Sequence, residues 1–142
     1  MPSGETPQFR IEMACERFGR AEVIRRCLAL LAGGSDDPRF IVMLGGPHAM
    51  DLIGAGTPAQ SYWLRVWAAR GLLWAGPGDD IDVLRAALTD DSWRVREMTC
   101  KVAARYRLGD LLDDISALES DSVPRVRAAA IRAVTLIVEA RA

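Results

Sequence analysis

Basic side chains recur at helical spacing in the last third of the chain. Arg94, Lys101 and Arg105 stand at i, i+7 and i+11, which places all three on one face of a helix. Arg125 and Arg132 repeat the first two of these positions 31 residues later. Guanidinium and ammonium groups gathered in this way bind carboxylates or phosphates, so the five residues are candidates for contacts with an acidic partner. The alternative is a solvated face without a ligand.

A second candidate is a stripe of tryptophans in the segment 58–75. Trp63, Trp67 and Trp74 stand at i, i+4 and i+11 and share one helical face. Arg70 lies within the same arc, at a spacing that suits cation–π stacking on Trp67 and Trp74. Tryptophan and arginine are typical anchors of protein interfaces, but aromatic stripes at helical spacing also pack into cores. We therefore expect either core packing or, if the stripe is exposed, the centre of a binding site near the basic face.

Catalytic or metal-binding chemistry has little support in the sequence. The single histidine, His48, lies three residues before Asp51, but such a pair alone has neither a nucleophile nor a third metal ligand. Cys15, Cys27 and Cys100 are widely spaced and form no Cys-x-x-Cys pair, which argues against a structural zinc site. We expect buried, reduced thiols, and we predict no catalytic residue, no cofactor and no metal.

The composition is that of a globular protein of about one domain. The chain has 142 residues, 50% of them hydrophobic, and a formal net charge of −1. No apolar run approaches the roughly 20 residues that a membrane span needs, and no signal peptide is recognisable, so a cytoplasmic protein without a membrane partner is predicted. Charge is nevertheless segregated locally, because residues 79–91 carry a net charge of −4 and residues 92–107 carry +4.

Capping side chains, prolines and glycines predict about nine helices and no strands. Thr6, Asp37 and Thr57 each precede a proline, as capping residues do at the first turn of a helix, and Ser92 and Ser122 are further candidate caps. The expected helices are residues 7–18, 20–32, 38–44, 47–53, 58–75, 80–89, 92–108, 110–119 and 123–140.

Two segments of the C-terminal half repeat one pattern at a distance of 31 residues. Asp90 aligns with Asp121 and Arg96 aligns with Arg127, and each motif lies between two predicted helices. Repeated helix pairs of about this length are the signature of a helical solenoid. The segment around Trp67 is a candidate for an older copy, in which the tryptophan replaces the arginine of the motif.

These motifs resemble the HEAT repeat, specifically the short HEAT-like repeats of the phycobilisome-lyase type. A typical unit of that family reads Asp, four residues, Val-Arg and then small residues, as residues 121–130 do. The resemblance covers roughly residues 58–140 and implies an all-α fold, a right-handed α–α superhelix of about four antiparallel helix pairs. We expect a single HEAT-like domain over residues 1–142, with degenerate N-terminal helices and a cap in residues 1–56 and recognisable repeats in residues 57–142.

The resemblance also implies roles for the charged residues of the motif. In HEAT-like repeats the aspartates and arginines resemble a ladder, in which each arginine bonds an aspartate of a neighbouring repeat. Asp90, Arg96, Asp121 and Arg127 are thereby implied to be structural, and Trp67 cannot supply that rung. The second helices of such solenoids line the concave surface, which is where the resemblance places the basic residues.

The last predicted helix, residues 123–140, has apolar residues around much of its surface. Its polar residues Arg125, Arg132 and Glu139 form a narrow line, whereas a terminal repeat ordinarily has a polar outer face. We expect this helix to meet another subunit or a partner protein, with self-association favoured.

The sequence therefore predicts a non-catalytic protein-interaction module or scaffold whose partner has an acidic segment. The alternative is binding of nucleic acid, because some DNA glycosylases that excise alkylated purines are built from HEAT-like repeats and use tryptophan, aspartate and arginine in a concave cleft. This chain has those residue types but is short and has no net basic charge. A chromophore lyase or isomerase is a further alternative that rests on the name of the repeat family alone.

Overall fold

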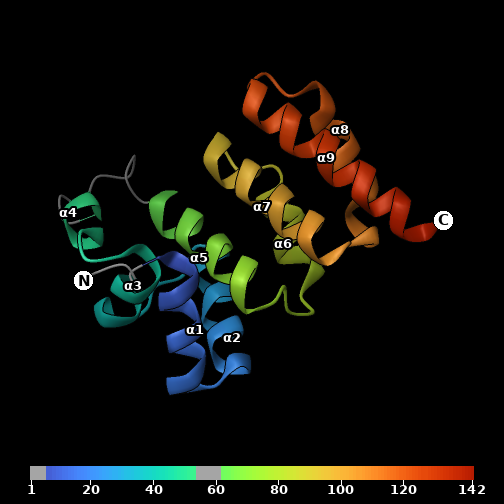
Figure 1. Cartoon of the computed structure of the whole chain (residues 1–142). Coiled ribbons are helices and arrows are strands. Elements are labelled where there is room, and N and C mark those ends of the chain that lie inside the picture. Colours follow the sequence, from blue (N-terminus) through green and yellow to red (C-terminus); the bar gives the residue numbers. More distant parts are fainter. Residues whose placement is uncertain (1–5, 54–61) are drawn as a thin grey trace. The chain divides into compact units, whose positions relative to one another are not determined.

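The computed structural model describes residues 6–53 and 62–142 of the chain. All regular secondary structure in these residues is helical, with nine α-helices and two short 3₁₀ helices (Figure 1). The predicted all-α fold is confirmed, while its right-handed twist stays a prediction, and Thr57 lies outside the described residues. The chain divides into two compact units, Met1–Gly78 (unit 1) and Asp79–Ala142 (unit 2). The expected single domain also stays a prediction.

Unit 1 is built around its last helix, α5, which packs against α1, α2 and α3 (Figure 1). The helices of this unit are α1 (Pro7–Phe18), α2 (Arg20–Leu31), α3 (Pro38–Gly45), α4 (Ala49–Ile53) and α5 (Tyr62–Ala75). Their apolar faces form a core whose largest fully buried side chains are Ile11, Val23, Leu30, Phe40, Leu44 and Leu72.

Two glycines allow helices of unit 1 to approach one another closely. A Cβ atom on Gly71 of α5 would lie 2.6 Å from the sulfur of Cys27 in α2. A Cβ atom on Gly45, at the end of α3, would lie 2.7 Å from the ring of Trp67 in α5. Both distances are shorter than any van der Waals contact, so these positions require glycine.

Two of the helix starts in unit 1 have the caps that the sequence predicts. The hydroxyl of Thr6 accepts a hydrogen bond from the Phe9 N–H at 3.1 Å. The carboxylate of Asp37 accepts one from the Arg39 N–H at 2.8 Å. In both cases a proline follows the capping residue, where a missing N–H costs nothing.

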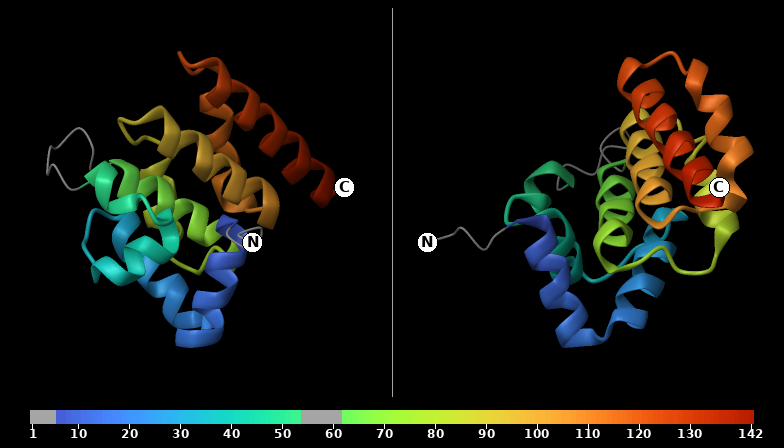
Figure 2. Two further views of the ribbon diagram at one scale, coloured as in Figure 1. Left: turned by 60° about the vertical axis from the view of Figure 1, so that its left-hand side comes forward. Right: turned by 45° about the vertical axis from the view of Figure 1, so that its right-hand side comes forward.

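The helices of unit 2 form two successive pairs, and the second helices, α7 and α9, pack side by side (Figure 2). α6 contacts α7, and α8 contacts α9. The helices of this unit are α6 (Ile81–Ala87), α7 (Trp93–Tyr106), α8 (Leu112–Ala117) and α9 (Pro124–Arg141), with 3₁₀ turns at Gly109–Leu111 and Leu118–Ser120.

Of the two predicted serine caps of unit 2, Ser92 occupies the N-cap position and Ser122 does not. Ser92 is the residue before α7 but makes no capping bond with its side chain, and α9 follows Val123 rather than Ser122. The aspartates of the repeated motif accept hydrogen bonds from backbone N–H groups just before these two helices. Asp90 accepts a hydrogen bond from the Ser92 N–H at 2.8 Å, and Asp121 accepts one from the Val123 N–H at 2.9 Å.

Charged side chains of the repeated motif join the two helix pairs. Arg96 donates through Nε and Nη2 to both carboxylate oxygens of Asp121, at 2.9 and 3.1 Å, and through Nη1 to the Asp90 carbonyl at 2.8 Å. One repeat later, Nη1 of Arg127 donates to the Asp121 carbonyl at 2.7 Å. The bidentate Arg96–Asp121 pair is largely buried, so it links neighbouring repeats in the way that the resemblance implies.

Candidate functional site

The basic residues that the sequence places on one helical face lie on the two second helices of unit 2. Arg94, Lys101 and Arg105 belong to α7, and Arg125 and Arg132 belong to α9. All of them except the half-buried Arg94 are exposed. Because α7 and α9 pack side by side, side chains from both helices can meet at this face.

Trp93 is the aromatic centre of this face. The guanidinium carbon of Arg94 lies 4.5 Å from the centroid of its ring, and that of Arg125 lies 5.2 Å away. Indole is the best aromatic partner for a cation, so the ring helps to orient both arginines. Helical spacing of the basic residues does not reveal Trp93. The available signal is its place directly before Arg94 in the repeated motif.

Glu97 contacts two of the cationic side chains of this face. The residue is 9% exposed, and its carboxylate accepts a hydrogen bond from Nε of Arg125 at 3.0 Å. Nζ of Lys101 lies 3.9 Å from the same carboxylate. Both cationic side chains stay accessible, at 65% for Arg125 and 46% for Lys101. We call Trp93, Arg94, Glu97, Lys101 and Arg125 the basic surface of unit 2.

Arg105 and Arg132 extend the basic surface along the two helices. The guanidinium of Arg105 lies 5.6 Å from the ring centroid of Tyr106. Arg132 follows Arg125 by seven residues, or about 10 Å along α9. Glu139 stands in line with Arg125 and Arg132 on α9, so the five predicted cations and the carboxylates of Glu97 and Glu139 together carry a net charge of +3.

The tryptophan stripe of α5 is not presented to solvent as a whole. Trp67 is 3% exposed and packs against Gly45, so core packing is the correct alternative for this residue. Its predicted role as a partner-binding anchor is wrong, because its ring is enclosed by unit 1. Trp63 stacks on Trp67 with ring centroids 6.0 Å apart, and Trp63 and Trp74 are both half-buried. Contacts of these two tryptophans with a partner stay a prediction.

Arg70 contacts the end of α3 rather than a tryptophan ring. Its Nη2 donates to the Leu44 carbonyl at 2.8 Å, and its Nε finds no acceptor among the described residues. Arg10 of α1 donates through Nε to the neighbouring Met43 carbonyl at 3.2 Å. Burial, with the positive charge of Arg10, lowers the pKa of the Arg70 guanidinium. Both arginines therefore satisfy carbonyls at the C-terminal end of a helix.

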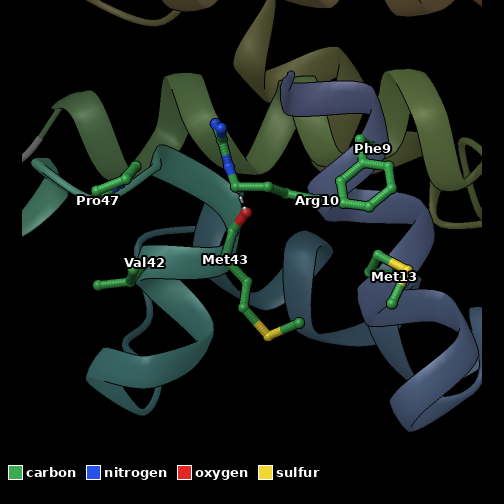
Figure 3. A pocket seen from close by; sticks show the side chains of 6 residues that line it. All are labelled: Phe9, Arg10, Met13, Val42, Met43 and Pro47. Carbon is green, nitrogen blue, oxygen red and sulfur yellow. Dashed lines mark hydrogen bonds between the residues drawn. The ribbon is translucent and has the colours of Figure 1, made fainter. Parts of the chain in front are cut away.

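An apolar groove of about 240 Å³ opens on unit 1 between α1 and α3 (Figure 3). Phe9 and Met13 of α1 line one side and are 45% and 44% exposed, while Val42 and Met43 of α3 line the other. The i, i+4 spacing of Phe9 and Met13 is typical of core positions, so the sequence does not reveal the groove. Among the described residues that line the groove, Arg10 is the one charged residue, and the remaining lining is suited to contacts with apolar side chains.

Groups that could support other chemistry are sparse in the described residues. His48 Nδ1 lies 3.5 Å from an oxygen of Asp51, and both side chains are exposed. No group of three or more His, Cys, Asp or Glu side chains in residues 6–53 and 62–142 is placed to hold a metal ion. Within the same residues, no helix has both the length and the apolar character needed to cross a bilayer. Cys15, Cys27 and Cys100 are buried thiols.

Comparison with known proteins places this arrangement in a family. No curated protein and no solved structure matches the chain. The family model for HEAT repeats matches residues 47–137, which include the motifs of unit 2. The match does not distinguish the phycobilisome-lyase type from other HEAT repeats. Since it spans more than half of the 142 residues, the protein belongs to the HEAT-repeat family.

Proposed function

We propose that the protein is a non-catalytic interaction module that binds an acidic segment of a partner protein through the basic surface of unit 2. HEAT repeats generally mediate protein–protein interactions, which supports the class of function. The observation that carries the proposal is the placement of two guanidinium groups beside the ring of Trp93. Tryptophan and arginine are the residues most often found at the energetic centre of protein interfaces.

Arg125 of α9 is held in place by contacts within the chain before a partner binds. Arg125 uses Nε for Glu97 and packs beside Trp93, and its terminal nitrogens meet no acceptor among the described residues. A carboxylate of the partner can bond these nitrogens while an apolar side chain covers the indole. Pre-ordering of a long side chain lowers the entropy cost of binding, which favours a specific contact over loose attraction.

Nucleic acid is the alternative ligand, because the same cations can neutralise phosphates. Two features favour protein. The whole chain has a net charge of −1, which gives no long-range attraction to a polyanion, and Glu97 places a carboxylate in the middle of the surface. A phosphate backbone would have to pass close to that charge, whereas a short acidic segment can place its carboxylates around it.

Self-association through α9 is the second part of the proposal. Ile131 and Val138 of this helix are 51% and 49% exposed, although both are large apolar side chains. Such exposure on a helix beside the basic surface supports a further protein contact, as the sequence predicts for the last helix.

Affinity capture from a lysate, with and without nuclease, tests the main proposal when it is combined with matched charge reversals. The test variant changes Arg94, Lys101 and Arg132 to glutamate. The control variant makes the same change of net charge on three exposed residues of unit 1, Arg17, Arg25 and Arg39.

Three outcomes distinguish the alternatives. A protein that is captured in both nuclease conditions, and lost with the test variant alone, supports the proposed surface. Capture that disappears with nuclease shifts the function to nucleic acid, and its affinity should then fall steeply with salt. Equal loss with the two variants contradicts the proposal, because net charge rather than this surface would then decide binding.

A further inference from the structure

The apolar groove between α1 and α3 continues into a second hollow that is basic. The apolar groove holds Phe9 and Met13 (Figure 3). The second hollow, of about 260 Å³, is lined by Arg17 at the end of α1 and by Arg39 at the start of α3. Met43 lines both, so the two hollows meet at this residue. We call them together the α1–α3 groove, which has one apolar end and one basic end.

A single line of side chains on α1 joins the two ends. Phe9, Met13 and Arg17 stand at i, i+4 and i+8, so they follow one side of the helix over about 12 Å. The two acidic residues of α1 lie elsewhere on the helix. Glu16 is about 100° and Glu12 about 140° round the axis from Arg17, and neither lines the groove. The line therefore runs from apolar to cationic without a carboxylate in it.

Arg17 carries the charge that the basic end does not compensate. Arg26 lines the same hollow but is bonded at two nitrogens to Asp36, and both side chains are largely buried. Nε of Arg39 lies 3.4 Å from the carboxylate of Asp37. Arg17 contacts an aromatic ring and meets no carboxylate among the described residues. Three arginines and two aspartates leave a net charge of +1, which one negative group of a ligand would neutralise.

Apolar atoms are available along the whole length of the groove. Phe9 and Met13 are exposed at the apolar end. The rings of Phe18 and Phe40 pack edge to face, 6.2 Å apart, and line the basic end, where the guanidinium carbon of Arg17 lies 5.3 Å from the Phe18 centroid. A matching ligand thus covers exposed apolar side chains at one end and presents one anion at the other.

We propose that the α1–α3 groove binds an amphipathic helix of a partner protein, with its apolar side chains over Met13 and one carboxylate at Arg17. Such a helix can lie along α1 in the antiparallel direction, with glutamate at i and apolar residues at i+4 and i+8. This order matches the spacing of Arg17, Met13 and Phe9, and it places the glutamate near the helix N-terminus, where the dipole favours an anion. α1 and α3 precede the residues that match the HEAT-repeat model, so the family does not assign this site.

A model helix tests the proposal, with fluorescence anisotropy of the labelled peptide and the full chain as the measurement. The probe is an alanine- and glutamine-based peptide with one glutamate and with leucines four and eight residues after it. A matched probe has glutamine in place of the glutamate. The unmodified chain should bind the glutamate probe about threefold more tightly at low salt, as expected of an exposed ion pair.

Two substitutions separate the ends of the groove. Arg17→Gln should remove the preference for glutamate and leave the affinity for the glutamine probe unchanged. Met13→Asp should weaken the binding of both probes about tenfold, because it places a charge against the leucines.

Matched controls make the same changes outside the groove. Arg25→Gln alters an exposed arginine of α2 and should keep the preference for glutamate. Met50→Asp alters an exposed methionine of α4 and should keep the affinity for both probes. Circular dichroism melts of every variant confirm that each one is folded.

Three results would overturn the proposal. They are no binding of the glutamate probe at high micromolar concentration, binding that Met13→Asp leaves unchanged, and a preference for glutamate that survives Arg17→Gln. The variant with Arg94, Lys101 and Arg132 changed to glutamate should bind the probe like the unmodified chain. Loss of binding in that variant would place the probe on unit 2 and would also count against the groove.

The groove and the basic surface of unit 2 are proposed for different partners, so either proposal can fail alone. Met13→Asp leaves the basic surface unchanged and should still capture the acidic partner. The control variant of the capture experiment reverses Arg17 and Arg39, so it should lose a helix bound in the groove and keep the acidic segment.

Discussion

Asp121 connects the two repeats of unit 2 through both its side chain and its backbone. Its carboxylate accepts hydrogen bonds from Nε and Nη2 of Arg96 and from the Val123 N–H, while its carbonyl accepts one from Arg127. The side chain is 8% exposed. The resemblance to HEAT-like repeats implies this role, because its ladder pairs each arginine with an aspartate of a neighbouring repeat and a buried charge persists only where it is paired.

We predict that the stability of unit 2 depends on pH through Asp121. Burial raises the pKa of this carboxyl, but the bonds from Arg96 and Val123 outweigh burial and hold the pKa below its ordinary value. A group with a lowered folded-state pKa adds stability above its unfolded pKa of about 4, and that stability is lost as the pH falls through the folded value. The free energy of unfolding should therefore fall below about pH 4.

Asp121→Asn should lower the unfolding free energy at pH 7 by about 3 kcal/mol, because it leaves Arg96 without its counter-charge. It should also flatten the pH dependence between about pH 2 and 5. Urea denaturation at a series of pH values measures both effects. Some pH dependence should remain, since the bond from Arg26 also lowers the pKa of Asp36 in unit 1. If the unfolding free energy of Asp121→Asn had the same pH dependence as that of the unmodified chain, the Arg96–Asp121 pair would not contribute to that dependence.

Glu97 offers a second test at the scale of one residue. Its carboxylate partly neutralises Arg125 and Lys101, so Glu97→Gln should strengthen binding of a labelled glutamate-rich peptide about threefold at low salt. Glu16→Gln makes the same change of charge at an exposed position of unit 1 and should have little effect. Fluorescence anisotropy measures both affinities. Equal affinities for the two variants would place the acidic segment elsewhere.

At the scale of elements, the contact between α2 and α5 depends on the absence of a side chain. Gly71→Ala would bring a methyl group to 2.6 Å from the Cys27 sulfur and 3.2 Å from Leu44. We expect a loss of about 1–3 kcal/mol, because a packed core cannot yield at both places without shifting. Gly109→Ala is the matched control, since its Cβ meets nothing within 4 Å. Thermal melts measure the stability of both variants. Equal stability would mean that α2 and α5 move apart at little cost in free energy.

Helix starts show which part of the local structure the sequence can predict. Thr6 and Asp37 were recognisable as caps because each precedes a proline, and both make the capping bond. Ser92 occupies the predicted cap position but makes no capping bond with its side chain, and Ser122 is not the cap of α9. In both places the motif aspartate, two residues or one residue earlier, bonds the backbone. A serine beside an aspartate leaves two candidate caps, and only the three-dimensional turn decides between them.

At the scale of the whole molecule, the periodic pattern predicts the helix pairs of unit 2, but it does not predict which side of α5 is exposed to solvent. The motifs of unit 2 recur in register, and the ladder between them was foreseeable from the resemblance. α5 buries Val66, Ala69 and Leu72 as well as Trp67, so apolar residues surround most of the helix. A pattern without a polar face cannot show which side meets solvent, and the sequence therefore left the tryptophan stripe undecided between core and surface.

The cysteines allow the two units to be followed separately during unfolding. Cys27 lies in unit 1 and Cys100 in unit 2, and both are 0% exposed. Burial raises the pKa of each thiol to about 12. Because the thiolate is the reactive form, neither should be alkylated at pH 8 until its own unit opens.

We predict that alkylation of these two thiols, measured at increasing urea concentrations, reports two unfolding transitions. Each transition should shift with substitutions in its own unit. Asp121→Asn should lower the midpoint for Cys100 more than that for Cys27, because the broken pair lies in unit 2. Gly71→Ala should do the reverse, because its clash lies in unit 1. Repeat proteins lose stability mainly where contacts between neighbours are lost, which is why each substitution should act on its own unit. Mass spectrometry of the alkylated peptides gives both midpoints from one sample. Equal shifts of the two midpoints in both variants would show that the units unfold as one cooperative structure.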